Sequence, residues 1–190
     1  MAINLQKGQR VDIGLTKVGV GLGWDPNASK SSAAYDLDAS AFMLGTNGKI
    51  PKEEFLVFYG NPESPDKAVA SSGDDTTGGN SDGGDDETLS VDLNRLDPKI
   101  EQILFTVTIY DALKRKQNFG QVRNSYIRIY DAMTQEEICK YELGEDFSIE
   151  NCVEFGRLYK RGGQWRFEAI GQGYECKGEY GMELFLQKYT

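Results

Sequence analysis

Apolar and polar residues alternate in most of the strongly patterned segments of this chain. The alternation runs through Val11–Leu15, Leu89–Leu93, Trp165–Ala169 and Met182–Leu186. A period of two is typical of a β-strand that buries one face and exposes the other. We therefore predict a half-buried strand in each of these segments.

Other segments are apolar on both faces or alternate over a shorter length. Leu56–Tyr59 and Ile103–Ile109 carry apolar residues at nearly every position, which favours central strands buried on both sides. Tyr126–Tyr130 and Val153–Tyr159 add two further predicted strands.

Helix signals are weak in comparison. Asp111–Asn118 could form two turns of helix and Asn94–Gln102 a short one, while turn signals such as Asn47–Gly48 separate the predicted strands. Short strands separated by loops predict an all-β fold, an antiparallel β-sandwich with little helix. A length of 190 residues without a visible linker predicts a single domain over residues 1–190.

The charge balance narrows the classes of function. The chain carries 30 acidic and 21 basic residues, a formal net charge of −9, and no histidine. An acidic surface argues against nucleic acid as a partner. The lack of histidine removes His-based catalysis and disfavours zinc, copper or nickel as native metals.

Cysteine usage and the N-terminus bear on the compartment. Cys139, Cys152 and Cys176 are odd in number and widely spaced, so we predict neither a disulfide framework nor a zinc site but reduced thiols. The first ten residues lack the apolar core of a secretory signal, and no apolar run reaches the length of a membrane span. We therefore expect a cytoplasmic protein without a transmembrane segment.

The most distinctive segment is the acidic loop Gly73–Glu87, which reads GDDTTGGNSDGGDDE. It holds five glycines, no basic residue and six carboxylates, namely Asp74, Asp75, Asp82, Asp85, Asp86 and Glu87. So much negative charge is repulsive unless a cation lies among it, and oxygen ligands on a flexible backbone suit calcium. The spacing does not match an EF-hand. The alternative is a solvated, mobile acidic loop.

A second acidic cluster lies upstream. Asp25 follows Trp24, and Asp36 and Asp38 open the run that ends at Leu44. On a strand, Asp36 and Asp38 would point to the same face about 6.6 Å apart. Calcium takes six to eight oxygens. The two clusters together would suffice for two ions, with long acidic metal-binding loops meeting at one end of the sandwich.

Other charged residues leave alternatives open. Asp111 would either join the metal shell or cap the turn that follows it. We interpret the basic residues Arg115, Lys116, Arg123 and Arg128 as a stripe that balances the acidic end rather than as a phosphate site.

Several motifs in one order resemble the tellurite-resistance TerD family. They are GLGWD (21–25), DLDASAFML (36–44), FLVFY (55–59), the acidic loop, VTIYDA (107–112), QNFGQVRNSYIRI (117–129) and FEAIGQGY (167–174). The resemblance implies a β-sandwich with two neighbouring calcium ions at one end, a cytosolic location and a role in resisting tellurite and other stresses. It implies no enzymatic activity.

The resemblance also supports the candidate ligands of the two acidic clusters. We predict metal ligation by Asp25, Asp36, Asp38, Asp74, Asp75, Asp82, Asp85, Asp86 and Glu87. The acidic loop carries two extra residues and reads GDD where the family usually has GDN. This departure leaves the alignment of Asp74, Asp75 and Asp82 open.

The expected function is therefore a calcium-binding interaction module. Its expected partners are other stress-resistance proteins of the same system, at the inner face of the membrane. Two alternatives come from other classes: a metal-dependent hydrolase of a phosphate ester, and a cyclic-nucleotide-binding module, which rests only on the description of some relatives.

Overall fold

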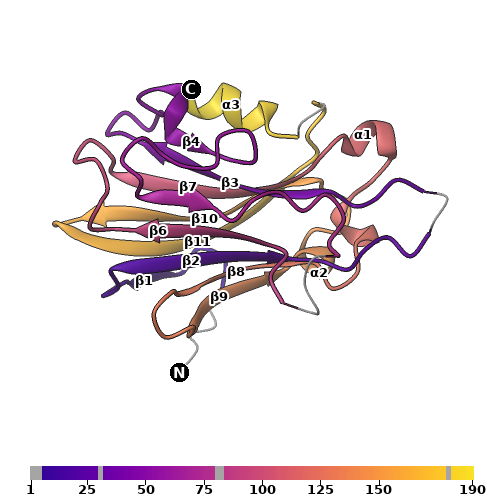
Figure 1. Cartoon of the computed structure of the whole chain (residues 1–190), viewed down its shortest axis with the longest axis horizontal. Helices are drawn as coiled ribbons and strands as arrows, with labels where there is room; N and C mark the ends of the chain where they lie inside the picture. The colour runs from indigo at the N-terminus through magenta and orange to yellow at the C-terminus, as the bar shows by residue number, and fades with distance from the viewer. Residues whose placement is uncertain (1–5, 30–31, 80–83, 179–180) are drawn as a thin grey trace.

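Two antiparallel β-sheets stack face to face in the computed structural model, which describes residues 6–29, 32–79, 84–178 and 181–190 (Figure 1). The first sheet has the order β1 (Arg10–Asp12), β11 (Gln164–Tyr174), β10 (Cys152–Arg161), β7 (Gln102–Ile109), β3 (Leu37–Leu44) and β4 (Leu56–Val57). The second has the order β5 (Val69–Ser71), β6 (Glu87–Asp92), β2 (Lys17–Gly23), β8 (Tyr126–Asp131) and β9 (Glu137–Glu142). The predicted antiparallel β-sandwich is confirmed.

Alternation along the strands builds the core between the sheets. Leu37, Ala39, Ala41 and Met43 of β3 join one apolar cluster, together with Val18, Val20 and Leu22 of β2. Successive residues of β3 point to opposite faces of the first sheet. Phe42 and Leu44 therefore belong to a second apolar cluster, on the face that points away from the second sheet. Asp38 and Ser40 share that outer side with Phe42 by the same period of two.

Most of the predicted strands are present, but Leu56–Tyr59 is not a central strand. Ile103–Ile109 lies in β7, which pairs with β10 on one side and β3 on the other and is therefore central, as predicted. By contrast, β4 covers only Leu56 and Val57 and forms the edge of the first sheet. Both residues are buried because Val57 faces the core while Leu56 joins the cluster on the outer side. Burial on two faces therefore does not require a central position.

The prediction of a strand at Met182–Leu186 is wrong, because α3 spans Glu183–Tyr189. Met182, Phe185, Leu186 and Tyr189 recur at helical spacing and contact the cluster outside the first sheet. Figure 1 shows α3 lying across this sheet beside β4 and the C-terminus. The period of two seen in this short segment was compatible with either structure.

The remaining helices are short. Residues 94–101 form turns rather than the predicted helix, and the predicted helix at Asp111–Asn118 shrinks to α1 (Ala112–Arg115). The others are α2 (Leu143–Asp146), η1 (Glu53–Phe55) and η2 (Phe119–Gln121). None of the helices in the described residues is long and apolar enough to cross a membrane.

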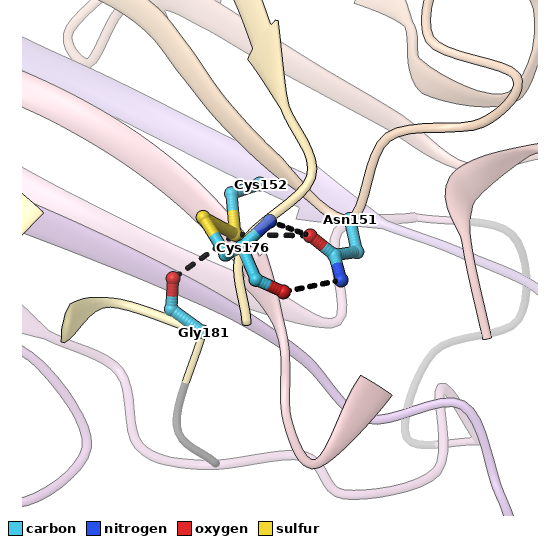
Figure 2. Close-up of a disulfide and its surroundings, with 4 residues drawn as sticks. All are labelled: Asn151, Cys152, Cys176 and Gly181. Atoms are coloured by element: carbon cyan, nitrogen blue, oxygen red, sulfur yellow. Dashed lines mark hydrogen bonds between the residues drawn. A yellow bond between two sulfur atoms is a disulfide. The ribbon is translucent and has the colours of Figure 1, made fainter. Parts of the chain in front are cut away.

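The prediction of three reduced thiols is wrong for two of the cysteines. Cys152 and Cys176 form a disulfide with a Cα–Cα distance of 6.0 Å (Figure 2). The register of the β10–β11 hairpin explains the pairing, because Cys152 lies opposite Tyr174, two residues before Cys176. Cys139 on β9 is buried and keeps its thiol, as predicted.

Candidate metal centre

The acidic segments predicted to meet do so at one end of the sandwich. The β2–β3 connection, the described part of the β5–β6 connection and the segment that follows β7 all reach this end, at the right in Figure 1. Antiparallel pairing of β2 with β6 and of β3 with β7 brings these ends together. Five of the carboxylates of these segments fall into two groups.

Asp36, Asp38 and Asp74 form what we call the first carboxylate group. Each offers an oxygen, and these oxygens lie within 4.8 Å of one another. Asp36 and Asp38 are buried, whereas Asp74 is exposed. They line a cavity of about 310 Å³ together with Tyr59, Thr76 and Tyr110. Carboxylates held this close repel one another unless they are protonated or bind a cation.

Burial and mutual repulsion shift the pKa of these groups upward. Burial, reinforced by the charges of Glu87 and Asp36, raises the pKa of Asp38 to about 9. Burial also raises the pKa of Asp36 to about 6, against the opposing effect of Arg115, whose Nη1 lies 3.5 Å from its carboxylate. Asp38 Oδ2 is buried and has no hydrogen-bond partner among the described residues. A proton or a cation would satisfy this oxygen.

Glu87 ties the acidic loop to the first sheet. It is the first residue of β6, and its two carboxylate oxygens each accept one backbone hydrogen bond, from Ala39 N and Asp75 N, both at 3.1 Å. Burial raises its pKa to about 8, although these hydrogen bonds oppose the shift. Asp75 in turn accepts bonds from Thr77 N and Gly78 N and so shapes the turn. Glu87 and Asp75 therefore hold the loop in place.

Asp25 and Asp86 form the second carboxylate group. They line a separate cavity of about 230 Å³ with Trp24, Pro26, Gly78, Gly84, Asn124 and Tyr126. Asp86 Oδ2 accepts a hydrogen bond from Trp24 N, and Asp25 Oδ2 accepts one from Asn124 Nδ2, both at 2.8 Å. Trp24 is buried in the core beneath this group. The two groups therefore line two separate cavities.

Gly78 allows the acidic loop to pass close to Trp24. Its φ is +71°, and a Cβ at this position would come within 2.4 Å of Trp24 Nε1. Glycine adopts such a backbone conformation more readily than a residue with a Cβ. Part of the glycine content of the loop is therefore structural.

Asp85 does not join either group. Its two oxygens accept bonds from Arg128 Nε and Nη2 at 3.0 and 2.9 Å, and Tyr126 donates to it at 2.8 Å. The carboxylate lies over Gly21 of β2, where a side chain would collide with it. Because the carboxylate of Asp85 is already paired with a guanidinium group, we interpret Asp85 as a structural residue rather than as the predicted metal ligand. Asp82 lies outside the described residues.

The basic stripe does balance part of the acidic end. Arg115 lies beside Asp36 and Arg128 pairs with Asp85. Asp111 makes no side-chain cap of α1 and instead lies 3.3 Å from Lys114 Nζ. The predicted capping role of its side chain is therefore not seen.

Sequence reasoning missed the uncharged lining of both cavities. Thr76, Tyr59 and Tyr110 line the first, and Asn124 lines the second. Tyr110 directly follows β7, whose last two residues pair with Leu37 and Asp38, and this sheet pairing was the available signal for it. Tyr59 lies two residues beyond β4, which pairs with Ala41 and Phe42 of the same strand β3. Asn124 carries a positive φ of 50°, which no local motif indicated.

The chemistry of the donors suits a hard cation. All of the side chains named in the two groups offer oxygen, and the first cavity adds hydroxyl groups to three carboxylates. Calcium prefers such sets and completes them with backbone carbonyls and water, whereas zinc and copper prefer nitrogen or sulfur. The residues present therefore fit calcium.

The chain is similar to known stress and resistance proteins. The TerD domain family model matches residues 1–187. General stress protein 16U of Bacillus subtilis (strain 168) is 45% identical over 97% of this chain and 100% of its own length. Tellurium resistance protein TerD of Serratia marcescens is 42% identical over 92% of each chain.

A solved structure shares the fold. The crystal structure of a homologue of telluride resistance protein (TerD) from Streptomyces coelicolor A3(2) superposes with a TM-score of 0.73. The match covers 85% of this chain and 92% of the other, at 22% identity. At this identity the likeness supports the fold alone.

Proposed function

Because the chain belongs to the TerD domain family, we propose that it is a calcium-binding protein of a stress-response and tellurite-resistance system. The first carboxylate group would hold one ion and the second group another. The observation that carries the proposal is the unpartnered, buried Asp38 Oδ2 beside Asp36 and Asp74. The relatives are named for stress and resistance rather than for an enzymatic reaction, and we propose no catalytic role.

The proposed role of calcium is to order this end of the sandwich. An ion between Asp36, Asp38 and Asp74 would replace mutual repulsion with attraction and join β3 to the acidic loop. At a hundredfold excess over its dissociation constant, each independent ion would add about 2.7 kcal/mol to the free energy of unfolding. The loaded surface would then present one fixed shape to partners.

Isothermal titration of the metal-stripped protein with calcium, with magnesium in competition, tests this proposal. We expect about two sites, with magnesium a poor competitor because it demands a smaller octahedral shell. Asp38→Asn should remove one site and Asp86→Asn the other. Asp85→Asn is the matched control and should keep both, since Asp85 pairs with Arg128.

Either of two results would contradict the proposal. One is the absence of calcium-specific heat from the wild-type protein. The other is unchanged stoichiometry in the Asp38→Asn and Asp86→Asn variants. In that case the acidic loop would be a solvated loop that binds no metal, and family membership would predict the fold of the protein but not its function.

We further propose that the calcium-loaded surface is an interaction module of the cytoplasm. Its partners would be other stress-resistance proteins of the same system, at the inner face of the membrane. The net charge of −9 supports recruitment to anionic lipid only through bridging cations. Co-sedimentation with vesicles of anionic and of neutral lipid, each with calcium or with chelator, tests this recruitment. We expect binding to anionic vesicles in calcium and none in chelator. Binding that does not depend on calcium would contradict the proposal.

A further inference from the structure

We propose that Cys152 and Cys176 are a redox-exchangeable pair that fastens the C-terminal segment onto the first sheet. We call residues 182–190 the C-terminal cover. Oxidation of the pair holds this cover against the outer face of the sheet, and reduction loosens it. The inference is independent of calcium binding.

The two cysteines are held together by groups other than sulfur. Asn151 binds the backbone of Cys176 twice: its Nδ2 donates to the Cys176 carbonyl at 3.0 Å, and its Oδ1 accepts from Cys176 N at 2.7 Å (Figure 2). Asn151 directly precedes Cys152 in the chain and is itself buried. The pair therefore remains in register after the sulfur–sulfur bond is broken, which favours its re-formation.

The site can accept both redox forms of Cys152. In the disulfide its sulfur is bonded to Cys176. As a thiol, it would have two oxygens within reach, Gly181 O at 3.0 Å and Asn151 Oδ1 at 3.2 Å. A buried S–H group that finds an acceptor carries little desolvation penalty. Reduction therefore leaves no unsatisfied polar hydrogen at Cys152.

The disulfide lies where the cover meets the sheet. Cys152 and Cys176 belong to the outer apolar cluster with Phe42, Leu104 and Phe185. Next to them, Gly181 approaches the sheet so closely that a Cβ would lie 3.0 Å from Thr108 Cβ. Figure 2 shows Gly181 beside the disulfide, on the chain that leads into α3. The disulfide therefore lies against the residue that precedes the cover, with Cys152 Sγ 3.0 Å from Gly181 O.

A second attachment holds the far end of the cover. The carboxylate of Glu154, 4% exposed on β10, accepts bonds from Lys188 Nζ at 2.7 Å and from Tyr189 Oη at 2.5 Å. The backbone of the cover is also held, because Tyr189 O accepts from Ile50 N at 2.8 Å. Reduction of the disulfide therefore releases one of several attachments. We expect the cover to loosen and open more often, not to detach from a folded protein.

The exchange is chemically balanced with a low-molecular-weight disulfide as oxidant. One cysteine thiolate attacks glutathione disulfide and releases one glutathione as a thiolate. The cysteine and the other glutathione are then joined in a mixed disulfide. The other cysteine then displaces the second glutathione, so two protein thiols lose two electrons and two protons in total. A dithiol reductant reverses the sequence. Both sulfurs are buried, so exchange requires an opening of the cover.

Thiol counting on the full chain tests the pairing. After equilibration with glutathione disulfide, the denatured wild-type protein should show one reactive thiol, and after dithiothreitol three. Cys139→Ala is the matched control and should change from none to two, because Cys139 lies on β9 in the other sheet. Cys176→Ser should show two thiols or mixed disulfides with glutathione, never an internal bond.

Amide hydrogen exchange of residues 183–189 tests the fastening. We expect exchange at least about 10-fold faster in the reduced protein than in the oxidised protein, since a disulfide restricts local opening. The Cys152→Ser/Cys176→Ser variant should exchange these amides at the rate of the reduced protein, and dithiothreitol should not change that rate. Glu154→Gln should speed exchange in both redox states without changing the thiol count.

The proposal is overturned if glutathione disulfide leaves three thiols in the wild-type protein. It is equally overturned if oxidised and reduced wild-type protein exchange these amides at the same rate. Both measurements use the wild-type chain, so they decide the matter even if the double variant fails to fold.

Discussion

Calcium binding at the first carboxylate group should displace protons, and their number can be derived from the structure. Without metal, the pKa values of Asp38, Glu87 and Asp36 lie at about 9, about 8 and about 6. At pH 7 the first two carboxyl groups are therefore mostly protonated, and the third is mostly ionised. An ion requires ionised ligands. We count Glu87, a ligand predicted from the sequence, with the first carboxylate group here, because each of its oxygens accepts one backbone hydrogen bond and keeps a second lone pair for the ion. Binding should release about two protons at this pH.

The same values set the pH dependence of the affinity. Deprotonating Asp38 and Glu87 weakens apparent binding at pH 7 by roughly a thousandfold relative to the fully ionised site. The penalty shrinks as the pH approaches the two pKa values. Apparent affinity should consequently rise about fiftyfold between pH 7 and pH 8.

Calorimetry in two buffers of different ionisation enthalpy, such as PIPES and Tris, measures the protons released. The Asp38→Asn variant should release about one proton fewer, because an amide has none to give. The Asp85→Asn control should release as many as the wild-type protein. Release of fewer than about half a proton at pH 7 would refute the reasoning, since the buried carboxyl groups would then be ionised without metal or would not face it.

The pKa shifts also predict how the metal-free protein responds to pH. A carboxyl group whose pKa is higher in the folded than in the unfolded state binds more protons when folded. The free energy of unfolding therefore falls as the pH rises. For Asp38 and Glu87 the window extends from the ordinary carboxyl pKa up to about 8 to 9. Denaturation in chelator should show lower stability at pH 8.5 than at pH 6, and saturating calcium should remove the difference.

Three further predictions concern packing and pairing. Gly78→Ala should destabilise the protein by about 1–3 kcal/mol in chemical denaturation, because of the positive φ and the contact with Trp24. Arg128→Met should cost about 2 kcal/mol by leaving the partly buried Asp85 with Tyr126 as its remaining partner and no positive charge, while titration still finds the wild-type number of calcium sites. Phe185→Ala should cost about 3–5 kcal/mol in thermal or chemical unfolding, since this fully buried ring anchors α3. Stability within about 0.5 kcal/mol of wild type would contradict the first and the third, and a changed number of sites the second.

The sequence by itself was informative wherever one local pattern had one structural solution. Period-two alternation predicted β6 and much of β11, and the β-branched run at Ile103–Ile109 predicted a central strand. The concentration of aspartate in short segments predicted an acidic end, because repulsion among carboxylates requires a compensating charge wherever they lie. The family motifs placed these observations in one fold.

Only the tertiary structure decided which groups meet. Strand pairing separated the acidic residues into two groups and set Asp85 against Arg128, and no spacing along the chain encodes that choice. Met182–Leu186 is helical because its apolar residues pack against the outer face of the first sheet. Packing on the same face places Cys176 beside Cys152. These outcomes depend on contacts between residues far apart in the chain, whereas alternation and composition report only on each residue and its near neighbours.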